Sequence, residues 1–146
     1  MNTSSTNGPQ AHPAILAFMT RRGIPAQDLR SDGRLTLNFD QKYRVHLHSA
    51  SHNRVALTAQ VLSLGGRYHD SVTDEVLERL MGLSAGLLQK HASSLCVDER
   101  AKSLLLQQTL PADASAETVE TSLADFVNVL PFWSSACANE ARLMVS

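Results

Sequence analysis

Apolar and polar side chains alternate in three consecutive runs, which lie at residues 34–39, 43–48 and 55–61. In the first run, Leu35, Leu37 and Phe39 alternate with polar residues. A period of two is typical of a β-strand that packs one face and exposes the other to water. Because only short polar segments separate the runs, they predict an antiparallel meander of three strands.

The segment before the meander predicts a helix from about Pro13 to Arg22. Its apolar residues Ile15, Phe18 and Met19 recur at helical spacing, which puts them on one side. Proline is tolerated in a first helical turn, and Gly23 is typical of the residue just beyond a helix.

After the meander, a second helix is predicted from about Thr73 to Lys90, and it carries two adjacent apolar stripes. The stripes are Val76, Leu80, Leu83 and Leu87 on one side and Leu77, Met81 and Leu88 on the other. One face of a small sheet cannot cover both stripes, which indicates a partner subunit. Two more strands are predicted at residues 94–97 and 103–108.

The last helix is predicted to begin with Ser115 as its N-cap, and it contains Pro131. Its apolar stripe continues past the proline at helical spacing and comprises Val119, Leu123, Phe126, Val127, Leu130, Trp133 and Cys137. An interior proline costs ~3 kcal/mol or more. Burying six large side chains of the stripe offers roughly 9–18 kcal/mol before entropy is subtracted. We therefore expect a helix that continues with a kink near Val127–Pro131, rather than one that ends at Leu130.

The order helix, three strands, helix, two strands, helix predicts an α+β fold with an antiparallel sheet covered by helices. The chain of 146 residues is long enough for one domain with a core. We expect that domain at residues 11–146. Residues 1–10 are rich in Ser, Thr, Asn, Gly and Pro, and we expect them to form a flexible arm.

Charge and hydropathy exclude several classes of partner. The net charge is −1, and the thirteen Lys and Arg residues are scattered, so neither nucleic acid nor membrane insertion is expected. No apolar run approaches the ~20 residues that span a bilayer, and no secretory signal peptide is recognisable. Cys96 and Cys137 lie in apolar runs, which favours buried free thiols in a reducing cytosol over a disulfide.

The best candidates for chemistry are three histidines. His46 and His48 lie two apart on a predicted strand and share a face, and His52 follows in the next turn. Such a set could hold a metal ion, but a solvated sheet face is the favoured interpretation. Cys96 lacks a basic neighbour that would lower its pKa, which argues against a nucleophile. We therefore expect no enzymatic activity and no cofactor, and a His-based metal enzyme stays a minor alternative.

Several segments together resemble the small dimeric chaperones of bacterial type III secretion that serve individual effectors, the Tir-chaperone-like family. The segments that carry the resemblance are Ile15–Met19 with Arg22–Pro25, Leu35–Asp40, Leu104–Pro111, and Leu123–Asn128 with Phe132 and Trp133. Each is weak alone, but their order and spacing cover nearly the whole chain after the arm. Two features depart from the family: its members tend to be acidic, and they usually lack a proline in the last helix.

The resemblance implies a homodimer in the bacterial cytoplasm without enzymatic activity. Such a chaperone binds the amino-terminal segment of one or more effectors in extended form, keeps it soluble and delivers it to the secretion apparatus. Whether the chain also binds the secretion ATPase is left open by the sequence. An alternative is a structural or regulatory dimer of the secretion system that binds a folded partner.

Matched onto this chain, the family's binding groove implies an effector site at Ile15, Leu16, Phe18, Met19, Leu35, Leu37 and Phe39. We expect the dimer interface at Leu77, Leu80, Met81, Leu88, Leu104 and Leu106. For each residue of the expected effector site, a place in the core is the alternative.

Overall fold

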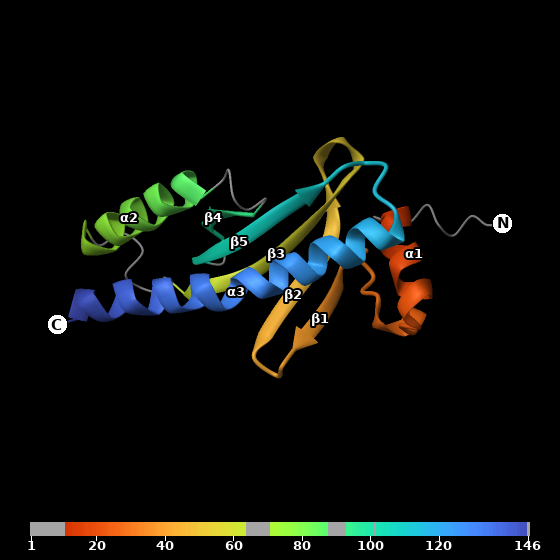
Figure 1. The fold of residues 1–146 in the computed structure, drawn as a ribbon, viewed down its shortest axis with the longest axis horizontal. Coiled ribbons are helices and arrows are strands. Elements are labelled where there is room, and N and C mark those ends of the chain that lie inside the picture. Colours follow the sequence, from red (N-terminus) through yellow and green to blue (C-terminus); the bar gives the residue numbers. More distant parts are fainter. Residues whose placement is uncertain (1–10, 64–70, 88–92, 101, 146) are drawn as a thin grey trace. The chain divides into compact units, whose positions relative to one another are not determined.

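The computed structural model describes residues 11–63, 71–87, 93–100 and 102–145 (Figure 1). The helices are α1 (Pro13–Arg22), α2 (Ser71–Leu87) and α3 (Ala116–Val145), and the strands are β1 (Leu35–Phe39), β2 (Tyr43–Ala50), β3 (Arg54–Ser63), β4 (Ser94–Asp98) and β5 (Ser103–Leu110). Two short 3-10 turns lie at Ala26–Asp28 and Ser51–Asn53. The order of elements confirms the predicted α+β fold. The expected arm and the expected end of the second helix at residues 88–90 lie outside the described residues.

The five strands form one antiparallel sheet in the order β1-β2-β3-β5-β4. In the β1–β2 hairpin, Leu35 lies opposite Leu47 and Phe39 lies opposite Tyr43. This register puts Leu35, Val45 and Leu47 on one buried face, as the alternation predicts. β1 and β4 are the edge strands.

The chain forms two compact units, each with its own apolar core. The first comprises Met1–Leu57 and Thr109–Asp125, and the second comprises Thr58–Gln108 and Phe126–Ser146. The first core contains Ile15, Phe18, Met19, Leu35, Val45, Leu47, Val55, Leu57, Leu110, Val119 and Leu123. The second contains Val76, Leu80, Leu95, Leu104, Leu106, Phe126, Leu130, Trp133 and Cys137.

Polar contacts inside the second unit tie its elements together. The buried Ser84 hydroxyl of α2 accepts a hydrogen bond of 3.0 Å from the Leu95 amide of β4. On α2, the Arg79 guanidinium donates to the Glu75 carboxylate at 2.8 Å and to the Glu140 carboxylate of α3 at 3.1 Å. Helix α2 is therefore joined to β4 by a neutral hydrogen bond and to α3 by the ion pair between Arg79 and Glu140.

Helix α3 begins as predicted, because the Ser115 hydroxyl accepts a hydrogen bond of 3.1 Å from the Thr118 amide. The helix continues past Leu130 with Pro131 in its interior, which confirms that it does not end there. The kink stays a prediction.

The apolar stripe of α3 is buried along most of its length. Its buried members are Val119, Leu123, Phe126, Leu130, Trp133 and Cys137. Val127, which the sequence put in the stripe, is only half-buried, whereas Val129 is buried. Phe132 is exposed, and its ring meets the Trp133 ring edge-on at a centroid distance of 5.2 Å.

Candidate functional site

Helix α1 starts at a buried histidine that serves as its N-cap. The Nδ1 atom of His12 accepts a hydrogen bond of 3.0 Å from the Ala14 amide. The Nε2 atom of the same ring lies 2.6 Å from the carbonyl oxygen of Asn53, to which it donates. His12 therefore satisfies an amide that the first helical turn leaves unpaired, and it ties α1 to the turn between β2 and β3.

Helix α1 ends at a glycine that the backbone requires. Gly23 has a φ of 70°, and the Ile24 amide donates to the Met19 carbonyl at 2.9 Å. This left-handed cap reverses the chain at low steric cost. It brings Ile24 back beside the helix, next to the buried side chain of Phe18.

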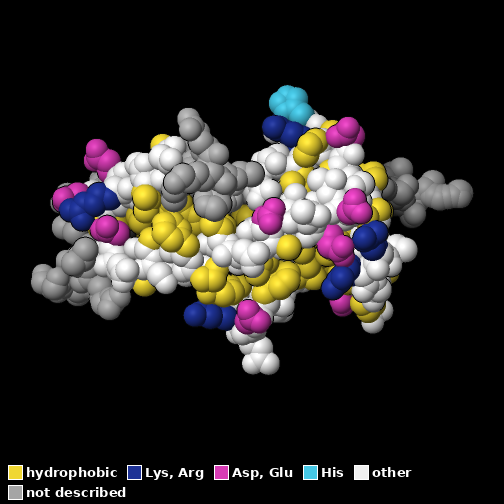
Figure 2. All heavy atoms as spheres, in the orientation of Figure 1, with side chains coloured by type: hydrophobic (Ala, Val, Ile, Leu, Met, Phe, Trp, Pro, Cys, Tyr) yellow, Lys and Arg dark blue, Asp and Glu magenta, His cyan; other side chains and the backbone are white. Residues whose placement is uncertain are grey.

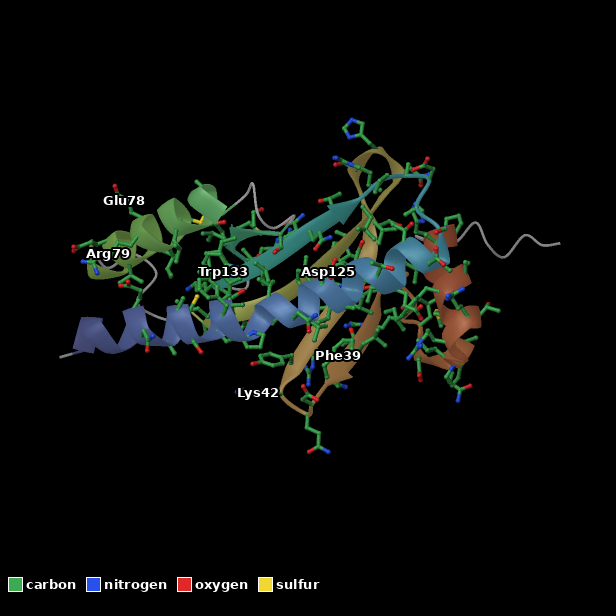
Figure 3. All side chains as sticks on the ribbon, in the orientation of Figure 1. Phe39, Lys42, Glu78, Arg79, Asp125 and Trp133 are labelled. Atoms are coloured by element: carbon green, nitrogen blue, oxygen red, sulfur yellow. The ribbon has the colours of Figure 1, made fainter. Side chains whose placement is uncertain are left out.

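A hollow with a volume of about 390 Å³ lies among α1, β1 and the start of α3. It is lined by Phe18, Arg22, Ile24, Leu37, Asn38, Phe39, Glu120, Leu123 and Ala124. All of these residues belong to the first unit. Most of the lining is apolar, and the volume lies at the low end of the range for ligand sites. The labelled Phe39 marks the β1 side of the hollow in Figure 3.

Charged side chains stand at one rim of this hollow. The Glu120 carboxylate accepts hydrogen bonds from Arg22 at 3.1 Å and from Arg21 at 3.4 Å. Both guanidinium groups are about half exposed, so each ion pair adds little stability. In the region of α1 and the start of α3, Figure 2 shows side chains of both charges beside apolar ones. The hollow therefore combines a mostly apolar lining with a charged rim.

The strand that lines the hollow is an edge strand. Leu29 forms an isolated antiparallel bridge with Leu35, and the Arg30 amide donates to the Arg34 carbonyl at 2.9 Å. These contacts cover the beginning of β1. In the described part of the chain, the sheet order gives the rest of β1 a neighbouring strand, β2, on one side only. Unpaired backbone groups at such an edge can pair with another extended chain.

The residues predicted to bind the effector fall into three groups in the structure. Ile15, Met19 and Leu35 are buried in the core of the first unit, away from the lining of the hollow. Phe18 is buried too but contributes to that lining, together with the half-buried Leu37 and Phe39. Leu16 is 46% exposed and does not line the hollow.

The other lining residues were not predicted. Ile24 follows the glycine that ends α1. Leu123 and Ala124 belong to α3, whose apolar stripe predicts buried side chains but not a hollow. Arg22 and Glu120 are 98 residues apart in the chain, and no local signal joins them. Gly23 was the one signal that could have directed attention to Ile24.

The residues predicted at the dimer interface also differ in exposure. Leu80, Leu104 and Leu106 are buried within the chain, Leu77 is half-buried, and Met81 is 38% exposed. Leu88 lies outside the described residues. Leu83 on α2 and Phe132 on α3 are exposed as well, so the second unit presents large apolar side chains.

Two of the three candidate histidines, His46 and His48, make hydrogen bonds within the β1–β2 hairpin. His46 shares a hydrogen bond of 2.8 Å with the Thr36 hydroxyl across the hairpin, and His48 lies 3.1 Å from the Ser49 carbonyl. Within the described ranges, no three His, Cys, Asp or Glu side chains are close enough to hold a metal ion.

The two thiols are poor nucleophiles. Burial raises the pKa of Cys96, whose thiol donates to the Gln107 side-chain oxygen at 3.1 Å. Burial also raises the pKa of Cys137, to about 11. A thiolate is the reactive form, and a raised pKa makes it scarce at neutral pH. Both cysteines are free, as the sequence predicts.

None of the helices in the described ranges combines the length and the hydropathy that crossing a bilayer requires.

An apolar hollow beside an edge strand suits the binding of an extended chain. The sequence matches the model of the Tir chaperone protein (CesT) family over residues 14–134. The chain belongs to this family, which confirms the resemblance to type III secretion chaperones. The family consists of secretion chaperones and not of enzymes.

Solved structures share the fold at low sequence identity. A chain of the ExsC–ExsE complex is 20% identical, with 92% of this chain and 96% of that chain covered and a TM-score of 0.63. In the HopA1–SchA chaperone–effector complex the identity is 15%, the coverage 81% and 88%, and the TM-score 0.56. In the Yersinia pestis type III secretion chaperone SycH with a stable fragment of YscM2, these values are 17%, 84% and 98%, and 0.55. No curated protein sequence matches the chain significantly.

Proposed function

We propose that the chain is a type III secretion chaperone that binds the amino-terminal segment of one or more effectors in extended form. The observation that carries this proposal is the position of the hollow against β1, an edge strand. A segment that pairs its backbone with β1 can place its apolar side chains in the hollow. The likeness of the fold to a chain of the HopA1–SchA chaperone–effector complex supports the same function.

Within this proposal, the predicted effector residues have different roles. Phe18, Leu37 and Phe39 contact the segment through the hollow. Ile15, Met19 and Leu35 are buried and hold α1 and β1 in position. Leu16 extends the apolar surface along the exposed side of α1.

Dimer formation is a second part of the proposal. Met81 and Leu77 are four residues apart on α2 and form one partly exposed apolar strip. Leu80, Leu104 and Leu106 support this face from the core of the second unit. Substituting Met81→Glu should lower the mass measured by sedimentation to that of one subunit. The matched change Leu16→Glu, in the first unit, should leave the mass unchanged. A chain that is a monomer before substitution would contradict the dimer.

Delivery is the third part. The chaperone acts in the bacterial cytoplasm, keeps the effector segment soluble, and hands it to the secretion apparatus. Binding to the secretion ATPase is a secondary proposal, which a pull-down with the purified ATPase would test. Loss of the effector from the chaperone when the ATPase and ATP are added would support delivery.

Co-expression with amino-terminal fragments of the secreted effectors from the same organism tests the function directly. Ala124 lines the hollow, and both Ala124 and Ala138 are exposed alanines of α3. Ala124→Phe should fill the hollow and abolish co-purification, whereas the matched control Ala138→Phe should retain it. Failure of every fragment to co-purify would contradict the proposal. A bound fragment that resists protease and gives dispersed amide signals would favour a folded partner.

A further inference from the structure

The β1–β2 hairpin has a second face, opposite to the one that borders the hollow. Thr36 lies across from His46, and Asn38 lies across from Arg44. Successive side chains of a strand point to opposite faces, so these four residues share the face that Leu37 and Val45 do not use. Asn38 is the one of the four that also contributes to the lining of the hollow. Continuing the register by one residue sets Arg34 opposite His48.

Basic side chains dominate this second face. Arg30 is linked to Arg34 by the backbone hydrogen bond at the beginning of β1, which puts both on the same side. We define the basic face by these positions as Arg30, Arg34, Arg44, His46 and His48. The charges of Arg34 and Arg44, and of Arg30 at longer range, all act on His46 and add to the effect of its burial in lowering its pKa. The strand register, with Asn38 opposite Arg44 and Arg34 one residue before Leu35, puts these basic positions on the same face.

The acidic residue next to this face is already engaged. The Asp32 carboxylate accepts a hydrogen bond of 3.0 Å from the Arg34 amide, which lowers the pKa of Asp32. Arg30 and Arg34 both act on this carboxylate, and its single negative charge is outnumbered by the three arginines of the basic face. The face therefore carries net positive charge although the whole chain carries −1.

A chain that pairs with the edge of β1 must present its side chains to both faces. Adjacent strands lie ~4.8 Å apart, and every second side chain points to the same face. One set of side chains would enter the hollow beside Leu37 and Phe39. Leu29 and Arg30 already pair with the beginning of β1, so the alternate set would lie next to Thr36 and Asn38, on the face that also carries Arg34 and Arg44. Opposite charges on neighbouring strands attract, and like charges repel.

We infer that the segment bound at β1 alternates apolar and acidic residues, with its Asp or Glu side chains over Arg30, Arg34 and Arg44. This inference rests on the proposed function and specifies the chemistry of the partner. The apolar residues give affinity through the hollow. The acidic residues fix the register, because shifting the segment by one residue would bring carboxylates to the hollow and apolar groups to the basic face.

Selection from a displayed library of random peptides tests the inference without knowing the effector. The library is applied to three full-length proteins: the unchanged chain, Arg34→Glu with Arg44→Glu, and the control Arg100→Glu with Lys102→Glu. The control makes the same change in net charge in the turn between β4 and β5. Arg34→Gln with Arg44→Gln removes the charges without reversing them, should the reversed variant fail to fold.

The expected result is enrichment of alternating apolar and acidic residues on the unchanged chain and on the control. On the reversed variant, Lys and Arg should replace Asp and Glu. A resynthesised acidic peptide should bind that variant about tenfold more weakly, as expected for the loss of a few exposed ion pairs. On the Gln variant, the acidic preference should disappear.

Three other outcomes would overturn the inference. Apolar enrichment without preference for charge, or with the same preference on every variant, would refute it while the chaperone function stands. No enrichment on any protein would count against segment binding itself. Co-sedimentation with phosphatidylglycerol vesicles that is lost in the reversed variant would assign the basic face to an anionic membrane instead.

Discussion

The imidazole of His12 bridges the first turn of α1 and the carbonyl oxygen of Asn53, 41 residues further along the chain. Its two nitrogens have opposite roles, since Nδ1 accepts from the Ala14 amide and Nε2 donates to Asn53. The side chain is 4% exposed, so neither partner can be replaced easily by water. The position of α1, and with it one wall of the hollow, depends on this ring.

Substituting His12→Ala should destabilise the protein by about 1–3 kcal/mol, because a helix cap and a buried hydrogen bond are both lost. Urea denaturation measures the change. His52 occupies the neighbouring turn, is exposed, and has a φ of 61°. The control substitution His52→Asn should leave the midpoint of urea denaturation nearly unchanged, because asparagine tolerates this left-handed backbone conformation. Equal effects of both substitutions would contradict the structural role of His12.

The pKa of His46 should lie below the ordinary value of 6.5, chiefly because burial disfavours the charged ring and then because Arg34 and Arg44 repel it. In the unfolded chain these effects are absent, so the unfolded state binds the proton first as the pH falls. The free energy of unfolding should therefore be highest above pH 6.5 and fall as the pH drops through the folded-state pKa.

His46→Gln should flatten this pH dependence below about pH 6.5, where the ordinary histidine and the shifted one differ in protonation. Proton NMR of the imidazole signals gives the pKa directly, and urea midpoints across the same range give its effect on stability. A His46 that titrates above 6.5 would contradict the prediction.

Arg79 should hold α2 in place through its ion pairs with Glu75 and Glu140. Substituting Arg79→Gln should increase amide hydrogen exchange in α2 more than elsewhere, because the bond to α3 is lost. The neighbouring Glu78, labelled with Arg79 in Figure 3, is exposed and offers Glu78→Gln as a matched control. Since Arg79 is exposed, added salt should reduce the difference between the two variants.

Pro131→Ala should stabilise the protein by up to about 3 kcal/mol, because alanine supplies the missing amide and removes the ring from the helix interior. Pro131 is exposed, so the substitution leaves no cavity. Thermal and chemical denaturation measure the gain. A loss of stability would mean that the backbone around Val127 depends on the proline ring.

Neither thiol of the folded protein should react rapidly with a disulfide reagent at pH 8. With a pKa of about 11, only about one Cys137 side chain in a thousand is ionised at that pH. Cys96 is shielded by burial and by its contact with Gln107. Both should react at once in guanidinium, which supplies the control. A thiol that reacts rapidly with the reagent in the native protein would contradict this prediction and show that one cysteine is more accessible than the structure indicates.

The boundaries of α1 were predictable because their signals are local. Pro13 fits a first turn and Gly23 fits a left-handed cap, and both conformations are set by the residue itself. The strands of the β1–β2 hairpin were predictable for a similar reason, since their alternation reports one packed face and one more exposed face. The one-sided pattern expected for β3 is wrong, because Ala56 and Thr58 are buried as well as Val55 and Leu57, so both faces of this strand are covered. His12 was missed because histidine is not a common cap and its second partner is distant in sequence.

The hollow could be predicted only in part. Phe18, Leu37 and Phe39 were identified through the family resemblance, but Ile15 and Leu35 were grouped with them although they are buried. An apolar stripe shows which side of an element avoids water. It does not show whether the side chains end in the core or border a space, because that depends on elements far along the chain.

The lining of the hollow has a consequence for selectivity. Apolar contact is not directional, and one methylene more or less changes the free energy of binding by only about 1–3 kcal/mol. Leu, Ile and Met, which are similar in volume, should therefore be comparable occupants of a space bounded by Phe18, Ile24 and Leu123. At the positions that would enter the hollow, we expect the proposed effector segment to be selected by side-chain volume and spacing rather than by residue identity. Under the proposed function, segments with different aliphatic residues at these positions would bind the same chaperone.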